Sequence, residues 1–170
     1  MLVLGIDPGL AITGYSLVRE RAGDLSLLTC GAMTTGAHLS TAKRLEQLHA
    51  ELKELLARYN PQEAAVERLF FSANAKTALL VGQACGVVLL TLAMADVPVY
   101  EYTPLQIKQA VTGYGRASKT QMQQMVKMLL GLEDIPQPDD AADAVAVAIC
   151  HLHSMQMASM LAEYDLSNEH

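Results

Sequence analysis

The chain has 170 residues, of which 51% are hydrophobic, and carries a net charge of −6. A chain of this length buries roughly 70% of its unfolded surface, so one domain with a substantial core is expected. No basic segment precedes the first apolar run, and no apolar run approaches the roughly 20 residues that span a bilayer. Neither a signal peptide nor a membrane partner is therefore expected.

Hydrophobic periodicity and turn residues predict five strands and five helices. Strands are predicted over residues 1–7, 13–20, 25–33, 63–67 and 97–102. Helices are predicted over residues 40–59 and 74–95, over a short segment from 104, over 118–131, and from 139 or 140 onwards. This order is typical of an α/β protein with a mixed five-stranded sheet and helices on both faces. Residues 1–160 are expected to form one domain, and residues 161–170 a polar tail that could be disordered.

Charges are unevenly distributed along this acidic chain. No acidic residue lies between positions 101 and 133, and this segment contains four basic residues: Lys108, Arg116, Lys119 and Lys127. Such segregation can place a basic face, suited to nucleic acid, on an acidic molecule. A chance run of basic residues on solvated faces explains the same charges.

Four acidic residues stand where an α/β sheet usually presents its ligands. Asp7 and Glu67 follow apolar strands at their carboxyl ends. Asp140 and Asp143 are three residues apart and therefore share one face of the last helix. Taken singly, each has an ordinary explanation, as a turn residue, a solvated strand end or an acid at a helix start.

Taken together, the four acids favour a metal site. Converging carboxylates repel one another in a cleft of low dielectric and stay ionised there only if cations lie between them. Oxygen ligands without His or Cys suit Mg²⁺, with Mn²⁺ as an alternative, and two such ions support phosphodiester hydrolysis. The residues alone leave both explanations open.

Four segments resemble the RuvC family of Holliday-junction resolvases, the bacterial crossover-junction endodeoxyribonucleases. The segments are LGIDPGLAITGYSLV, VERLFFSANAKTALLVGQACGV, TPLQIKQAVTGYGRASKTQM and PDDAADAVAVAICH, in family order within residues 1–155. The resemblance implies a ribonuclease-H-like fold and a homodimer that cuts two opposed strands of a four-way DNA junction in recombination and repair. It also implies a branch-migration complex, of the RuvA and RuvB type, as a partner.

The resemblance implies which acids form the catalytic site. The catalytic and metal-ligating residues would be Asp7, Glu67, Asp140 and Asp143, which would hold two Mg²⁺ ions per subunit. Asp7 would contact both ions, because it ends the central strand between the other ligands. Asp139 falls outside the family pattern and is interpreted as a helix cap or a surface acid.

DNA-binding residues follow from the same resemblance. Lys108 and Lys119 match basic positions that the family uses near the scissile phosphate, and Arg116 lies in the same loop region. An ordinary glycine-rich turn is the alternative for that loop. Phe70 matches the aromatic residue that stacks on an unpaired base at the crossover. Its neighbour Phe71 would belong to the core.

The helix over 74–95 is apolar over most of its surface and contains Gly82 and Gly86, four residues apart. The resemblance implies that it forms the dimer seam; burial within one subunit is the alternative.

The three cysteines lie far apart and form no Cys-x-x-Cys pair, so reduced thiols in a cytoplasmic protein are expected.

Two other functions compete with the resolvase hypothesis. A nucleotide-binding ATPase of the actin-like superfamily also begins with a strand, Gly-x-Asp and a turn. It would need a second glycine-rich phosphate loop, which the sequence does not contain. A non-catalytic junction-binding protein on the same fold would be expected to lose carboxylates, and all four are present.

Overall fold

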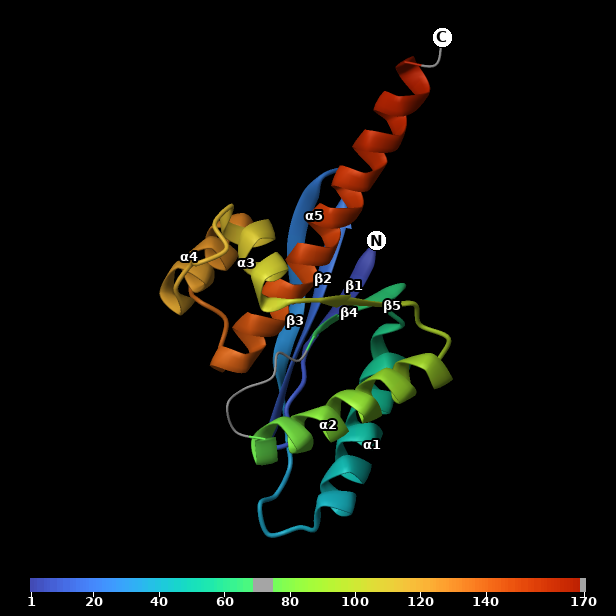
Figure 1. Cartoon of the computed structure of the whole chain (residues 1–170), viewed down its shortest axis with the longest axis vertical. Coiled ribbons are helices and arrows are strands. Elements are labelled where there is room, and N and C mark those ends of the chain that lie inside the picture. The colour runs from blue at the N-terminus through green and yellow to red at the C-terminus, as the bar shows by residue number, and fades with distance from the viewer. Residues whose placement is uncertain (69–74, 169–170) are drawn as a thin grey trace.

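The computed structural model describes residues 1–68 and 75–168 and contains one five-stranded mixed sheet (Figure 1). Its strands are β1 (Leu2–Asp7), β2 (Ile12–Arg21), β3 (Asp24–Thr34), β4 (Glu63–Glu67) and β5 (Val99–Tyr102). Their spatial order is β3-β2-β1-β4-β5. The predicted mixed sheet is confirmed, and each predicted strand is present.

Strand directions decide which ends of the strands meet. β1 pairs antiparallel with β2 and parallel with β4, and β4 pairs parallel with β5. Ile6 lies opposite Val66, so Asp7 and Glu67 both emerge at the same edge of the sheet. Carboxyl ends of parallel strands are the usual position of ligand sites in such folds.

Helices cover both faces of the sheet, as predicted (Figure 1). They are α1 (Thr41–Tyr59), α2 (Ala75–Met94), α3 (Pro104–Thr112), α4 (Lys119–Leu129) and α5 (Asp139–Asn168). Ser40, Thr103 and Ser118 accept hydrogen bonds from the backbone N–H groups that open α1, α3 and α4. α1 ends at Tyr59, because the next residue, Asn60, has a left-handed backbone conformation that terminates the helix before Pro61.

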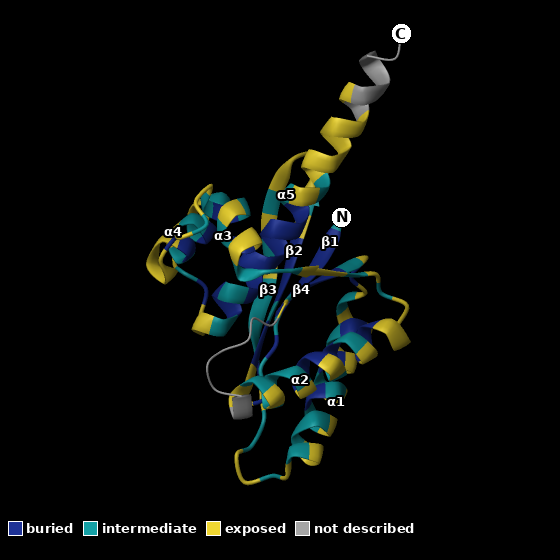
Figure 2. Cartoon of the chain, in the orientation of Figure 1, coloured by how far each residue is buried: buried dark blue, intermediate teal, exposed yellow. Residues whose placement is uncertain are grey.

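The sheet separates two apolar cores (Figure 2). On one face, α1 and α2 bury residues such as Leu48, Leu52 and Val88 against the sheet. On the other face, α5 lies directly on the sheet, and α3 and α4 pack against α5. The segment from Ala141 to Cys150 includes fully buried residues such as Val145 and Ile149, which explains its apolar sequence.

α5 is longer than the sequence indicates. A polar tail is expected from residue 161, whereas the structure continues the helix to Asn168. Its outer part extends beyond the sheet, with Met157, Met160 and Leu161 exposed (Figures 1 and 2). By length and composition, Thr77–Met94 and Asp139–Ala162 could cross a membrane, but core helices pass the same test, and half of the second segment is buried in this fold.

Candidate active site

Asp7 and Glu67 form the centre of the candidate site. The parallel pairing of β1 and β4 places their side chains next to each other, and the two carboxyl groups share a hydrogen bond. One of two hydrogen-bonded carboxyl groups must carry a proton, because two ionised carboxylates can only accept. The two carboxyl groups therefore need a proton or a cation to balance their negative charge.

Burial and mutual repulsion perturb the acids of this site. Burial, followed by the charges of Glu67, Asp143 and Asp140, raises the pKa of Asp7 to about 8. Burial also raises the pKa of Glu67, against the opposing charge of Lys108. The pKa of Asp143 is raised by burial and held down by Lys119. Asp7 is consequently protonated at neutral pH unless a cation replaces its proton.

α5 supplies the other two acids, and glycines in the sheet let it approach. Gly14 lies opposite Asp7 in the β1–β2 register, and a Cβ at Gly14 would overlap the carbonyl oxygen of Asp140. One helical turn further along, a Cβ at Gly5 would overlap the carbonyl oxygen of Ala144. The first turns of α5 can therefore rest on the strand backbones only where glycine stands in the sheet.

A buried hydrogen bond fixes the helix at this position. Ser16, which lies opposite Gly5 in the sheet, donates from Oγ to the carbonyl oxygen of Ala144 at 2.9 Å. Sequence reasoning missed Gly5, Gly14 and Ser16 as residues that position the site. The available signal was a glycine inside each of two strands, which often marks a close backbone approach.

Two predicted lysines join the acids in a cleft of about 220 Å³. Among the described residues, it is lined by Glu67, Pro104, Ile107, Lys108, Lys119, Met122, Asp143 and Ala146. The ammonium group of Lys119 lies 3.4 Å from Oδ2 of Asp143. The cleft thus brings Lys108 and Lys119 together with Glu67 and Asp143, although the sequence places them in separate elements; Asp7 and Asp140 do not line it.

Of the other two predicted DNA-binding residues, one lies outside this cleft and one outside the described residues. Arg116 lies exposed in the segment between α3 and α4 and does not line it. Phe70 falls within residues 69–74, outside the described residues. Asp139 is an exposed acid, consistent with the interpretation as a surface acid, but its carboxylate is engaged by Lys119.

The donor chemistry of the site fits a hard divalent cation. Within residues 1–68 and 75–168, no three His, Cys, Asp or Glu side chains are arranged to hold an ion already. Instead, the raised pKa of Asp7 favours a proton between Asp7 and Glu67, and the ammonium group of Lys119 lies 3.4 Å from Asp143. A proton and an ammonium group thus partly compensate carboxylate charge that Mg²⁺ or Mn²⁺ would compensate more fully.

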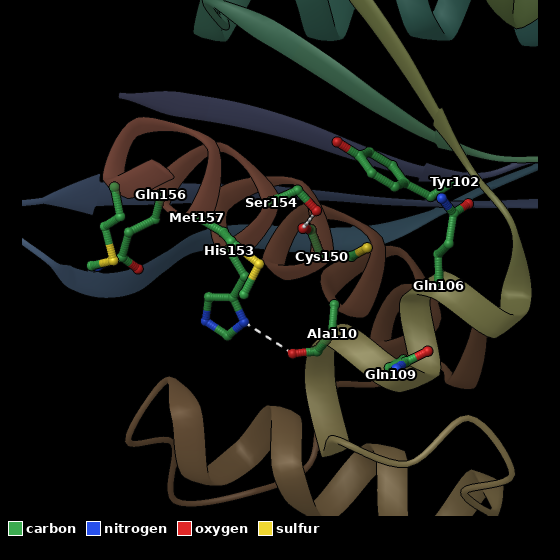
Figure 3. A pocket seen from close by; sticks show the side chains of 10 residues that line it. Tyr102, Gln106, Gln109, Ala110, Cys150, His153, Ser154, Gln156 and Met157 are labelled. Carbon is green, nitrogen blue, oxygen red and sulfur yellow. Dashed lines mark hydrogen bonds between the residues drawn. The ribbon is translucent and has the colours of Figure 1, made fainter. Parts of the chain in front are cut away.

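A larger pocket, of about 570 Å³, lies elsewhere, between α3 and α5 (Figure 3). Glutamine, methionine and aromatic side chains such as Gln109, Met157 and Tyr102 line it, and His153 donates a hydrogen bond to the carbonyl oxygen of Ala110 at 3.0 Å. No described carboxylate or lysine lines it. It therefore lacks the groups that phosphodiester chemistry needs.

Comparison with known structures gives the class of fold. The chain has the fold of ribonuclease-H-like Holliday junction resolvases. The Thermus thermophilus RuvC, solved in complex with a Holliday junction substrate, superposes with a TM-score of 0.88 and 38% identity over 93% of this chain and 96% of that chain.

The chain belongs to the RuvC family of crossover junction endodeoxyribonucleases. Residues 3–151 match the family model described as "Crossover junction endodeoxyribonuclease RuvC". The enzyme of that name from Syntrophomonas wolfei is 55% identical over 161 residues, 95% of this chain and 94% of the relative. That from Roseiflexus is 58% identical over 160 residues, 94% of this chain and 95% of the relative. The predicted fold and enzyme class are confirmed, and the ATPase alternative is wrong.

Proposed function

We propose that Asp7, Glu67, Asp140 and Asp143 hold two Mg²⁺ ions per subunit, or Mn²⁺ in their place, and cut four-way DNA junctions. The observation that carries this proposal is the meeting of Asp7 and Glu67 at the ends of two paired parallel strands, beside the cleft that Asp143 and Lys119 line. Burial and the charges of the other three acids raise the pKa of Asp7 to about 8. A functional site explains this repulsion better than a structural role does, because uncompensated buried charge lowers stability.

The role of each carboxylate would follow from its position in the fold. Asp7 lies at the end of the central strand, with Glu67 on the neighbouring strand and the two aspartates above it on α5. When bound, the ions would stabilise negative charge on the phosphate and lower the pKa of the attacking water. The protein would hold the acids at fixed separations, because each stands on a strand end or on a buried helix.

Lys108, Lys119 and Arg116 would contact the phosphates of the junction, and Phe70 would stack on a base. The charge of Lys108 acts on Glu67, and Lys119 lies beside Asp143, so both lysines border the proposed metal site. Arg116 is exposed outside the cleft, where it could contact a phosphate further along the strand. The junction-bound Thermus thermophilus relative supports the choice of substrate.

A homodimer would present two such sites to a two-fold symmetric junction. α2 buries Val88 and Leu92 against its own subunit but exposes Leu79, Leu90 and Met94 by 65%, 59% and 69%. A Cβ added to Gly86, on the same exposed stripe, would meet no atom within 4 Å. An apolar stripe with a glycine suits close packing against the same stripe of a second copy.

Two further proposals concern the cellular setting. Cys30, Cys85 and Cys150 are all unpaired, which supports a reducing, cytoplasmic compartment. Family membership supports cooperation with a branch-migration complex of the RuvA and RuvB type.

The proposed function is tested with four-way junctions labelled in turn on each strand. With Mg²⁺ or Mn²⁺, we expect paired nicks at symmetric positions in two opposed strands, leaving 5′-phosphates and 3′-hydroxyls that a ligase can rejoin. A linear duplex of the same sequence serves as the control and should stay intact. Junction binding without nicking in either metal would overturn the proposal.

A further inference from the structure

Asp139 makes a set of contacts that its place outside the family pattern does not explain. It is the first residue of α5, and its Oδ2 forms an ion pair with the ammonium group of Lys119 at 3.1 Å. Its Oδ1 accepts a hydrogen bond from Nε2 of Gln123 at 3.1 Å. Lys119 and Gln123 stand one helical turn apart on α4, so one carboxylate joins the start of α5 to one face of α4.

The same ammonium group also reaches the proposed metal site. Lys119 Nζ lies 3.1 Å from Asp139 and 3.4 Å from Asp143, so it bridges an acid outside the site and an acid inside it. A cation held by Asp143 would repel this ammonium group. Asp139 would then remain as its anionic partner and would keep it at the rim of the cleft.

We propose that Asp139 is a positioning residue that holds the ammonium group of Lys119 where it meets a phosphate of the bound junction. This inference rests on the proposed function of Lys119. The lysine side chain is 52% exposed and has four rotatable bonds, so it would otherwise spread over many conformers. Gln123 donates a hydrogen bond to the Asp139 carboxylate, and this bond fixes the orientation of the carboxylate that holds Lys119.

A purely electrostatic role for Asp139 makes the opposite prediction. An exposed carboxylate near DNA repels phosphate, so its removal would tighten junction binding and leave the salt dependence and the nicking rate unchanged or improved. Loss of a positioning residue lowers the nicking rate and removes one phosphate contact, although the protein has become less negative. An exposed ion pair contributes little to folding, so stability should hardly change.

The experiment compares Asp139→Asn with Asp134→Asn, which removes the same charge from an exposed residue five positions earlier. Without metal, we measure the slope of the logarithm of the junction-binding constant against the logarithm of the salt concentration. The steepness of this slope should decrease by about one unit, equivalent to one phosphate contact, in Asp139→Asn and in Lys119→Met. It should stay unchanged in Asp134→Asn. At saturating junction with Mg²⁺, the nicking rate of Asp139→Asn should fall roughly fivefold or more.

Combining the two substitutions decides whether Asp139 acts through Lys119. In the Lys119→Met background, Asp139→Asn should cause no further loss of salt slope or of nicking rate. The inference would be overturned if Asp139→Asn and Asp134→Asn had the same salt slope and nicking rate. It would also be overturned if Asp139→Asn lowered the salt slope and the nicking rate as much in the Lys119→Met background as in the unmodified protein. Absence of nicking by the unmodified protein would instead refute the proposed function, and the metal-free salt slopes would still test Asp139.

Discussion

Gly14 and Asp140 touch through their backbones: the carbonyl oxygen of Asp140 occupies the space that a Cβ at Gly14 would need. Because Gly14 lies opposite Asp7 in the sheet, this contact sets the distance between α5 and Asp7. The distance between two proposed metal ligands, one on a strand and one on a helix, therefore depends on a glycine that carries no chemistry of its own.

Gly14→Ala should lift the start of α5 and separate Asp140 from Asp7. We expect the nicking rate to fall at least about tenfold, because small displacements of catalytic groups have large effects on rate. Overpacking of this kind costs about 1–3 kcal/mol of unfolding free energy, measurable by denaturant titration. Gly36→Ala is the matched control, since the three atoms nearest to its methyl group would belong to the ring of His38, a side chain in a loop. Equal activity of both variants would contradict this account of α5.

The metal-free protein should lose stability as the pH rises from about 5 to 8. The pKa of Asp7 is about 8 in the folded chain, against an ordinary value of 3.8. Between these values the folded chain binds a proton that the unfolded chain has released, so raising the pH favours unfolding. In EDTA, the melting temperature of Asp7→Asn should exceed that of the unmodified protein at pH 8, and the two should converge towards pH 4.

Addition of Mg²⁺ at pH 8 completes this test. It should raise the melting temperature of the unmodified protein by about 4 °C or more, because the ion binds the folded chain selectively. It should not stabilise Asp7→Asn. A melting temperature that is independent of both pH and Mg²⁺ would show that the four acids are not an uncompensated cluster.

Sequence reasoning selected the four acids as candidates but could not give their arrangement. Asp7 and Glu67 could be found because an apolar strand that ends in an acid is visible in a single sequence. Spacing could not separate Asp139 from Asp140, because both share a helix face with Asp143; in the structure, Asp139 bonds to α4, whereas the backbone of Asp140 rests on Gly14. That difference arises from packing between elements far apart in the chain.

The length of α5 shows a similar limit. Residues beyond Glu163 are polar and lack a periodic apolar face, and such a pattern predicts a tail. The structure nevertheless continues the helix to Asn168. The position of Phe70, the one predicted DNA-binding residue outside the described ranges, stays a prediction.

His151 is fully buried and links α5 to two strands. Its Nε2 lies 2.6 Å from Oε2 of Glu63, and its Nδ1 lies 2.8 Å from the hydroxyl of Tyr102. His151→Ala would leave a cavity and would deprive Glu63 and Tyr102 of their partly buried hydrogen bonds. We expect a loss of about 3–5 kcal/mol in unfolding free energy.

Chemical denaturation of His151→Ala and His153→Ala provides the comparison. His153 is less buried, and its bond to the carbonyl oxygen of Ala110 is the one hydrogen bond that it makes within the described part of the chain, so its loss should cost about 1 kcal/mol. Equal effects of the two substitutions would show that the buried network contributes little to holding α5 on the sheet.

Leu90→Glu should convert the proposed dimer into a monomer, because a charge would then face the same charge of the second copy in an apolar seam. Light scattering measures the mass, and junction cleavage should lose the pairing of nicks. Leu28→Glu, which changes an exposed leucine on β3, is the control and should leave the mass unchanged. A dimeric Leu90→Glu protein would place the seam elsewhere.

Junction cleavage by Asp7→Asn, measured together with junction affinity, tests the central claim most directly. Asn keeps the size of the side chain and removes the negative charge that the proposed ions require. With Mg²⁺ at saturating junction, we expect nicking to fall by at least about a thousandfold, while the dissociation constant changes by less than about threefold. Nicking by Asp7→Asn at the rate of the unmodified protein would contradict the assignment of this carboxylate cluster as the catalytic site.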